Sequence, residues 1–269
     1  MRRSSSSSSH ASRAPDADFF LVKDKPSYIG PFLQLHANRI SEAWRGLRAV
    51  ARGEEPPRHV DRPDDGAELW PELVDSLFAM NFAAAQVLGS ELARLHPDGS
   101  LRVLDVGAGA AVWSIGCARV EPRVRATALD LEGTLPSARA HVERFELTSR
   151  FDYLAGDLRE LDFGEQRFEA VVLGHICHAE GRANTRKLLA KCARALVPGG
   201  TLAIAEFVPD DDRSGPVGPL LFALNMLVNT TDGDTFTLAD FREMCAECGL
   251  RDVRTLDAPA PSPLILATR

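Results

Sequence analysis

The spacing of hydrophobic residues divides the chain near residue 97. From Phe19 to about Arg52 the apolar positions recur at near-helical intervals, namely Phe32, Leu35, Ile40, Trp44 and Leu47. A polar connector follows from Gly53 to Gly66, and a second helical stretch runs from about Leu69 to Leu95. The pattern predicts a small helical N-terminal region at residues 19–97. Residues 1–18 include the run Ser4 to Ser9 and little to bury, so a disordered tail is expected there.

After Pro97-Asp98-Gly99, short β-rich runs alternate with helical patterns, which is typical of a parallel sheet built from βαβ units. The predicted strands are Leu101–Val106, Val124–Leu129, Phe151–Leu154, Ala170–Leu173 and Thr201–Phe207. The predicted helices are Ala111–Val120, Leu135–Phe145, Ala183–Leu196 and Leu238–Cys248, followed by a closing hairpin of Arg251–Leu256 and Leu264–Thr268. Residues 98–269 are therefore expected to form a Rossmann-like α/β domain with helices on both faces of its sheet.

Composition narrows the classes of partner. A chain of 269 residues that is 45% hydrophobic can bury one substantial core. The net charge of −7 argues against a nucleic-acid partner, which normally needs a basic face. No apolar run reaches the roughly 18 to 20 residues that cross a bilayer, and the N-terminus lacks the apolar stretch of a secretory signal. We therefore expect a cytoplasmic protein with no membrane partner.

The five cysteines predict neither a disulfide framework nor a metal site. Their number is odd and their spacing irregular. Cys245 and Cys248 resemble half of a zinc site, but no second cysteine or histidine pair supplies the other two ligands. We expect them to be ordinary helix residues.

A glycine loop follows the first predicted strand, in the run Asp105-Val106-Gly107-Ala108-Gly109. Ligands of doubly wound sheets bind at the carboxyl ends of the strands, and the first strand-helix turn approaches them most closely. Glycines let that backbone adopt unusual angles and lie against a ligand, while the next helix offers free N–H groups to an anion. The loop predicts a nucleotide-like cofactor.

Three further positions bear on the cofactor. Both nicotinamide and S-adenosylmethionine enzymes use an acidic residue such as Asp130, so only Val112 and Asp157 distinguish between them. A dinucleotide fingerprint would place its third glycine at position 112, which is Val112 here, and this weakens a nicotinamide site. Asp130 ends the second strand, where a carboxylate accepts both ribose hydroxyls, and Gly156-Asp157-Leu158 ends the third, where Asp157 is placed to meet an adenine amine. A tight turn and two helix caps would explain the same residues structurally. Together, at successive strand ends, they favour S-adenosylmethionine.

At this point the chain resembles a known family. Five features resemble those of class I small-molecule O-methyltransferases of the bacterial hydroxyneurosporene and plant caffeate type. They are the run 103–109, Asp130, the run 155–157, the stretch Leu173-Gly174-His175-Ile176-Cys177-His178 and the turn 198–200. The likeness covers about residues 70 to 269. It implies that the cofactor is S-adenosylmethionine. The residues expected to bind it are Asp105, Gly107, Ala108, Gly109, Asp130, Leu131, Gly156, Asp157, Leu158, Gly174 and His175.

The resemblance also assigns the acceptor side. It implies that His178 is the general base and that Phe222, Asn225 and Met226 line the substrate site. It further implies that residues 19–97 are a dimerisation and substrate-lid-like region, corresponding to a helical N-terminal domain that has a winged-helix portion in the family. We expect that portion to be absent from residues 19–97, which puts the homodimer in question. The acidic residue that usually follows the family's histidine is Ala179 here, with Glu180 one place further, and the loop's usual third glycine is Ala111.

The chemistry fits these residue types. Methyl transfer to a phenol or enol requires alignment of acceptor and methyl and removal of a proton, and histidine accepts a proton near neutral pH. We expect Glu180 or another carboxylate to orient the His178 ring. His175 is expected to line the cofactor pocket, Trp113 to lie beside the cofactor or in the core, and Glu206 to face the acceptor site or be a solvated charge.

The acceptor is expected to be a small molecule, because the aromatic motif of base methyltransferases is absent after the fourth strand. Methylation at oxygen or at the carbon of an enol stays open. The rival hypotheses are an S-adenosylmethionine-binding protein that transfers no methyl, such as a decarboxylase, hydroxylase or regulator, a nicotinamide oxidoreductase, and a non-catalytic interaction subunit.

Overall fold

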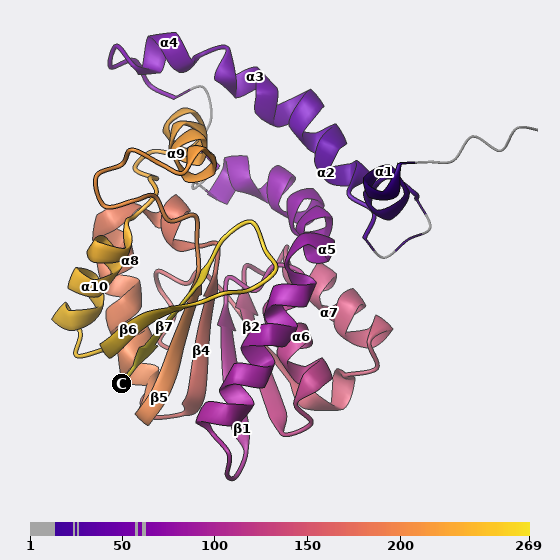
Figure 1. Ribbon diagram of the computed structural model, residues 1–269, viewed down its shortest axis with the longest axis vertical. Helices are drawn as coiled ribbons and strands as arrows, with labels where there is room; N and C mark the ends of the chain where they lie inside the picture. Colours follow the sequence, from indigo (N-terminus) through magenta and orange to yellow (C-terminus); the bar gives the residue numbers. More distant parts are fainter. Residues whose placement is uncertain (1–13, 24, 26, 57–58, 61–62) are drawn as a thin grey trace, which may run out of the picture.

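A seven-stranded sheet in the order β3-β2-β1-β4-β5-β7-β6 forms the centre of the molecule (Figure 1). The computed structural model describes residues 14–23, 25, 27–56, 59–60 and 63–269. The strands are β1 (Leu101–Val106), β2 (Val124–Asp130), β3 (Phe151–Ala155), β4 (Phe168–Gly174), β5 (Leu196–Ala205), β6 (Arg251–Leu256) and β7 (Leu264–Thr268). Strands β1 to β5 pair in parallel, whereas β7 pairs antiparallel with both β5 and β6. The predicted α/β fold and its closing hairpin are confirmed.

Alternate residues of the central strands are buried against opposite faces of the sheet. In β4, Val172 belongs to one hydrophobic cluster and Val171 to the other. Strands covered on both faces are apolar almost throughout, which explains why β1 and β4 are continuous hydrophobic runs. The chain runs outward from β1 to β3 and then returns to β4 on the other side of β1. This reversal opens a crevice at the carboxyl ends of β1 and β4.

Helices cover both faces (Figure 1). The helices from Pro63 onward are α5 (Pro63–Leu95), α6 (Val112–Val120), α7 (Leu135–Arg144), α8 (Cys177–Ala195), α9 (Val217–Asn229) and α10 (Leu238–Glu247), with a 3-10 turn η2 at Thr148–Arg150. Residues of α5, α6 and α7 bury one face of the sheet, and residues of α8 and α10 bury the other.

Helix α5 belongs to the core of the sheet domain as well as to the N-terminal region. A Cβ on Gly116 of α6 would lie 2.3 Å from Cβ of Ala85, and one on Gly89 would lie 2.6 Å from Cα of Cys117. Such close approach of two backbones requires glycine at the crossing. By length and composition alone, residues 73–95 are apolar enough to span a membrane, although Asp75 and Glu91 interrupt the apolar run. The buried side of this stretch packs against α6.

The N-terminal arm consists of short helices above the carboxyl ends of the strands (Figure 1). They are α1 (Pro15–Phe20), α2 (Gly30–Leu35), the π-helix η1 (His36–Ile40), α3 (Ser41–Trp44) and α4 (Leu47–Val50). Of the predicted disordered tail, residues 1–13 lie outside the described residues. Residues 15–18 begin α1 instead, where Pro15 occupies the first turn and Asp16 and Asp18 favour a helix N-terminus.

Two boundaries differ from the sequence prediction at the site itself. Helix α8 begins at Cys177, six residues before the predicted start at Ala183, and is interrupted at Gly181, where φ is 70° and ψ is 167°. Strand β5 begins at Leu196, so the predicted turn Pro198-Gly199-Gly200 lies within the strand. The pairing of β5 with β4 shifts register beside it, between Phe168 and Ala170.

Candidate active site

The glycine loop after β1 is confined from both sides. Gly107 and Gly109 have φ of +63° and +56°, which favour glycine. A Cβ on Gly107 would lie 2.3 Å from Cδ1 of Ile176, and one on Gly109 would lie 2.9 Å from Cγ1 of Val74. A side chain at either position would collide with these neighbours, so glycine is required at both.

Asp130 holds the glycine loop in place. Its Oδ2 accepts a hydrogen bond from the N–H of Gly109 at 2.7 Å, and its Oδ1 accepts one from the N–H of Leu131 at 2.7 Å. Burial raises the pKa of Asp130, although these N–H donors oppose the shift. Each carboxylate oxygen keeps a second lone pair, so Asp130 retains the capacity to accept ribose hydroxyls.

Asp105 lies beneath the loop, apart from the cofactor cavity. It is fully buried, and its Oδ2 accepts hydrogen bonds from the N–H of Ser114 at 3.0 Å and its hydroxyl at 2.6 Å. Its Oδ1 has no hydrogen-bond partner among the described residues. Burial raises the pKa of Asp105 to about 7. Asp105 therefore anchors the first turn of α6 and is not among the residues that line the cavity.

A cavity of about 180 Å³ runs along the carboxyl ends of β1 to β4. With the one exception of Asp105, all the residues predicted to bind the cofactor line it, namely Gly107, Ala108, Gly109, Asp130, Leu131, Gly156, Asp157, Leu158, Gly174 and His175. The glycine cradle, the Asp130 carboxylate and Asp157 fit the carboxylate, ribose and adenine of S-adenosylmethionine in turn. Asp157 accepts the N–H of Arg159 with one oxygen at 2.8 Å, which leaves its other oxygen for a ligand amine.

Trp113 both fills the core and lines this cavity. It is 3% exposed, and a Cβ on Gly174 would lie 2.1 Å from its Nε1. Gly174 is therefore required for Trp113 to lie at the strand end. Both alternatives predicted for Trp113, core and cavity lining, hold at once.

A second cavity of about 220 Å³ adjoins the first. Both are lined by His175 and Ala179, which lie at their junction. Phe222, Asn225 and Met226 of α9 line the second cavity, together with His178. The predicted substrate residues and the predicted base thus line the same cavity, which adjoins the cofactor cavity.

Hydrogen bonds to Glu206 fix the position of His178. Its Nδ1 lies 2.8 Å from Oε2 of Glu206, and its backbone N–H donates to Oε1 at 3.1 Å. Glu206 is 2% exposed, and although burial alone raises its pKa, the charge of His178 and these hydrogen bonds outweigh burial and lower it. An ionised carboxylate only accepts, so Nδ1 of His178 is the donor in this contact, and Nε2 is the ring nitrogen that is not bonded to Glu206.

Glu180 does not orient the His178 ring, contrary to one predicted option. Its carboxylate receives two hydrogen bonds from the Arg159 guanidinium, at 2.8 Å and 3.1 Å. The expectation that another carboxylate orients the ring holds for Glu206. Glu206 does not line the acceptor cavity, because its carboxylate is turned to His178.

His175 is neutral at physiological pH. Burial lowers the pKa of His175 to about 4, and its Nε2 lies 2.8 Å from the hydroxyl of Ser262. Its φ of 60° is unusual for a residue other than glycine. Together with its hydrogen bond, this geometry supports a role in lining the junction rather than in proton transfer.

The N-terminal region was expected to cover the substrate, but none of its residues was named as part of the acceptor cavity. Phe32, His36 and Ile40 line it, and Nε1 of Trp44 donates to Oδ1 of Asn225 at 3.0 Å. Their near-helical spacing was visible in the sequence, but periodicity does not say which distant element a helix covers.

Cys245 lies in α10 and Cys248 is its C-cap, which agrees with the expectation that they are helix residues. All five cysteines lie among the described residues and are free, and burial raises the pKa of Cys245 to about 12. No group of three His, Cys, Asp or Glu residues within the described ranges is arranged to hold a metal ion.

The sheet and the cavity at its crevice are arranged as in solved class I methyltransferases. A family model described as an O-methyltransferase domain matches residues 83–251. The chain belongs to this O-methyltransferase family, as its sequence motifs predict.

Named relatives agree with this family. The chain is 31% identical over 246 residues to 3-hydroxy-5-methyl-1-naphthoate 3-O-methyltransferase of Streptomyces sahachiroi, covering 91% of this chain and 71% of the relative. It is 27% identical over 259 residues to the tetracenomycin polyketide synthesis 8-O-methyl transferase of Streptomyces glaucescens, covering 95% and 75%. The fold is similar to that of human N-acetylserotonin methyltransferase in complex with S-adenosylmethionine, with a TM-score of 0.82 and 19% identity, over 95% of this chain and 74% of that chain.

The protein is thus an S-adenosylmethionine-dependent methyltransferase that acts on small molecules. The hypothesis of a nicotinamide oxidoreductase is wrong, because the chain belongs to an O-methyltransferase family.

Proposed function

We propose that this enzyme methylates a hydroxyl group of an aromatic polyketide-type acceptor, with His178 as the general base. The observation that carries the proposal is the arrangement of His178, whose Nδ1 is held by buried Glu206 while its ring lines the acceptor cavity. A ring fixed in this way presents the lone pair of Nε2 to an acceptor hydroxyl.

The bound cofactor supplies an electrophilic methyl group on a sulfonium. Within the protein, the junction at His175 and Ala179 joins the two cavities, and His178 takes the proton of the acceptor hydroxyl on Nε2. The ionised Glu206 stabilises the imidazolium that results. The proton then leaves to solvent, and the products are a methyl ether and S-adenosylhomocysteine.

The lining of the acceptor cavity supports an aromatic acceptor. Phe207 and Phe222 stack with ring centroids 4.2 Å apart, and Phe222 meets the His178 ring edge-on at 4.8 Å. Flat aromatic walls favour a flat ligand. The names of two relatives, for a naphthoate hydroxyl and for tetracenomycin polyketide synthesis, point to the same class.

The test is turnover of 3-hydroxy-1-naphthoate and dihydroxynaphthalenes with S-adenosylmethionine, followed by mass spectrometry of methyl ether and S-adenosylhomocysteine. His178→Ala is expected to lower kcat by about 100-fold or more, because the general base is lost. Binding of S-adenosylhomocysteine, measured by calorimetry, is expected to be unchanged.

His141→Gln is the matched control, because His141 also pairs with a carboxylate, Asp75, at 3.1 Å but lines neither cavity. Full turnover by the His178→Ala variant would remove His178 from the mechanism.

Carbon methylation is the second candidate. A relative of Streptomyces lavendulae is named L-tyrosine C(3)-methyltransferase. It is 26% identical over 191 residues, and the match covers 67% of this chain and 52% of that relative. The same base would serve an enolic or phenolic carbon. The carbon shift of the transferred methyl in the product NMR spectrum distinguishes an ether from a C-methyl.

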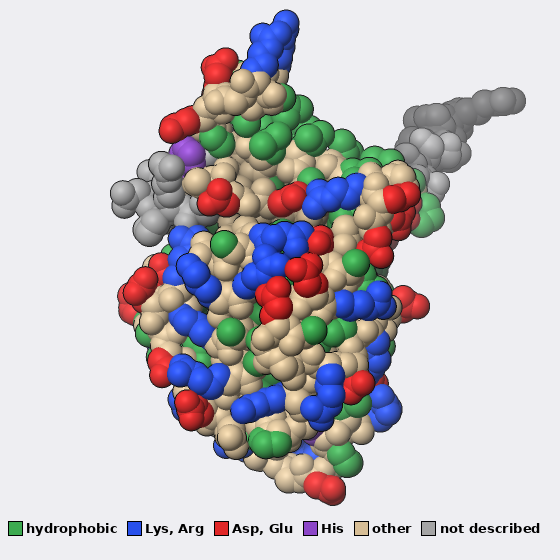
Figure 2. Space-filling view, turned by 90° about the vertical axis from the view of Figure 1, so that its left-hand side faces the viewer, with side chains coloured by type: hydrophobic (Ala, Val, Ile, Leu, Met, Phe, Trp, Pro, Cys, Tyr) green, Lys and Arg blue, Asp and Glu red, His purple; other side chains and the backbone are tan. Residues whose placement is uncertain are grey.

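We further propose a cytoplasmic homodimer without nucleic-acid or membrane partners, in which residues 19–97 form the dimer contact and cover the acceptor. The net charge of −7 supports the absence of a nucleic-acid partner. The dimer contact is supported by exposed apolar residues on the arm, namely Phe19, Phe20, Leu21 and Leu33. Figure 2 shows hydrophobic side chains gathered at the upper end of the molecule, above a body where both signs of charge are mixed.

A further inference from the structure

The turn that carries His178 is separated from the rest of its helix. Gly181 interrupts α8 three residues after His178. Next to this break, the carbonyl oxygen of His178 accepts a hydrogen bond from the N–H of Asp234 at 3.0 Å, and the carbonyl of Cys177 accepts one from the Thr185 hydroxyl at 3.1 Å. The position of His178 therefore depends on a segment more than fifty residues away in the sequence.

That segment, residues 230–237, packs backbone against backbone on the His178 turn. A Cβ on Gly233 would lie 2.6 Å from the carbonyl oxygen of His178, and one on Gly181 would lie 2.7 Å from the carbonyl oxygen of Asp232. Glycine at both positions permits this approach. A shift of segment 230–237 would therefore displace His178.

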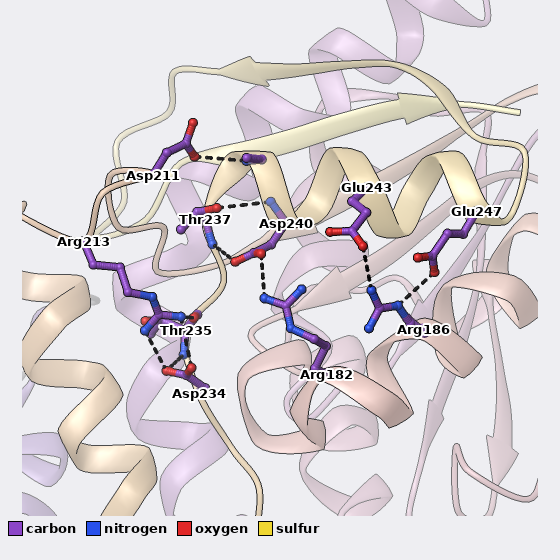
Figure 3. Close-up of polar contacts among 11 residues, drawn as sticks. Arg182, Arg186, Asp211, Arg213, Asp234, Thr235, Thr237, Asp240, Glu243 and Glu247 are labelled. Atoms are coloured by element: carbon purple, nitrogen blue, oxygen red, sulfur yellow. Dashed lines mark hydrogen bonds and ion pairs between the residues drawn. The ribbon is translucent and has the colours of Figure 1, made fainter.

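Arg213 fastens segment 230–237 to the loop that follows Glu206. Its guanidinium makes two hydrogen bonds to the Asp234 carboxylate, at 3.0 Å and 3.2 Å, and a third to the carbonyl of Thr235 at 2.7 Å (Figure 3). A planar fork that binds a carboxylate with two parallel bonds fixes orientation as well as distance. The contacts form a closed circuit from Glu206 to His178, to Asp234, to Arg213, and back along the chain to Glu206.

The Arg213–Asp234 ion pair also joins the two ends of the segment that forms one wall of the acceptor cavity. Arg213 precedes α9 and Asp234 follows it, so their ion pair joins the two ends of the excursion that carries Phe222, Asn225 and Met226. One contact thus sets both the wall that holds the acceptor and the turn that holds His178.

We propose that Arg213 and Asp234 are positioning residues for methyl transfer, and that their ion pair sets His178 in register with the acceptor held by α9. This inference rests on the proposed role of His178 as the base. Both side chains are about two-fifths exposed, at 40% and 43%. Such pairs contribute little to stability, so the loss is expected in turnover and in the order of the His178 ring.

The test compares Arg213→Ala, Asp234→Ala and the double variant with Arg186→Ala. Arg186 is the matched control, because it is 34% exposed and pairs with Glu243 and Glu247 in the same region without a bond to the His178 turn (Figure 3). The readouts are kcat and KM with the naphthol turned over in the acceptor screen, and S-adenosylhomocysteine affinity. A third readout is solvent exchange of the His178 Nδ1 proton by NMR in the S-adenosylhomocysteine complex.

Arg213→Ala is expected to lower kcat about tenfold, because a small displacement of the base from the acceptor slows proton removal. The Nδ1 proton is expected to exchange faster, while cofactor affinity and the Arg186→Ala control stay at wild-type values. The double variant is expected to lose no more than either single one, since each breaks the same contact. Arg213→Lys, which keeps the charge without the fork, is expected to recover part of kcat and serves in place of Arg213→Ala if that protein does not fold.

Turnover and proton exchange equal to those of Arg186→Ala would overturn the proposal, as would losses that multiply in the double variant. Its failure is distinct from failure of the proposed base. If His178→Ala keeps full turnover, the base is wrong, whereas the exchange of the Nδ1 proton still reports whether Arg213 orders the His178 ring.

Discussion

At the scale of single residues, the same side chain type serves different purposes at successive strand ends. Asp130 and Asp157 line the cofactor cavity, whereas Asp105 is buried below it and bonds to Ser114. The sequence places all three at strand ends but does not distinguish them. Which carboxylate reaches the cavity depends on where each strand stops relative to the loop above it.

Asp105 is expected to make stability depend on pH. Burial raises its pKa from 3.8 to about 7, so the folded protein binds this proton more tightly than the unfolded chain. The resulting stabilisation is complete below pH 3.8 and is lost as the pH rises to about 7. Asp105→Asn removes this loss, because an amide keeps the acceptor for Ser114 without a charge. Relative to wild type, its free energy of unfolding is expected to rise by more than about 1 kcal/mol between pH 4.5 and 7.5 in urea titrations.

The control for this experiment is Asp152→Asn, an exposed carboxylate on β3. Its difference from wild type is expected to be small and constant across the same range. A difference for Asp105→Asn that does not change with pH would contradict the buried, proton-binding state of Asp105.

At the scale of elements, the N-terminal arm and α9 together form the acceptor cavity. The π-helix and α2 contribute His36 and Phe32 to its lining, while Trp44 of α3 bonds to Asn225 of α9. The periodicity of the arm predicted its helices correctly in kind. It gave no information on their partner, because α9 lies about 180 residues further along the chain.

Trp44→Phe is expected to weaken acceptor binding. The variant keeps the aromatic volume but removes the donor to Asn225, whose side chain then loses a fixed orientation in the cavity wall. The expected result is a rise of about threefold to tenfold in acceptor KM, the equivalent of one net hydrogen bond. Kinetic titration with the naphthol acceptor measures it, and S-adenosylhomocysteine affinity in the same protein is the internal control. An equal rise in the dissociation constant of the cofactor would show that the arm acts on the whole site.

At the scale of the whole molecule, the outer side of α9 is apolar. Val217, Leu221, Leu224 and Leu227 are exposed, with Leu221 at 50%, and they recur at helical spacing. Helix α9 lies against α3 and α4 of the arm, at the upper end of the molecule (Figure 1). A surface of this kind would extend the dimer contact proposed for residues 19–97 onto α9.

Leu221→Glu is expected to shift the protein from dimer to monomer in sedimentation velocity, because a charge at the centre of an apolar contact must be desolvated without a partner. Val120→Glu is the control, since Val120 is also exposed, at 39%, but lies on α6. A monomeric wild-type protein, or equal behaviour of both variants, would contradict a dimer formed through α9 and the arm.

The sequence alone determined the order of elements, the glycine loop and the family, because these depend on local periodicity and on motifs read within a few residues. Every strand of the predicted sheet was confirmed in place, with limits that differ by a few residues. Only the tertiary structure decided that Glu206 rather than Glu180 holds His178, that the arm completes the acceptor cavity, and that Arg213 and Asp234 close the base of α9. These contacts join residues from different strand ends and loops, so they exist only once the sheet has brought those ends to one edge.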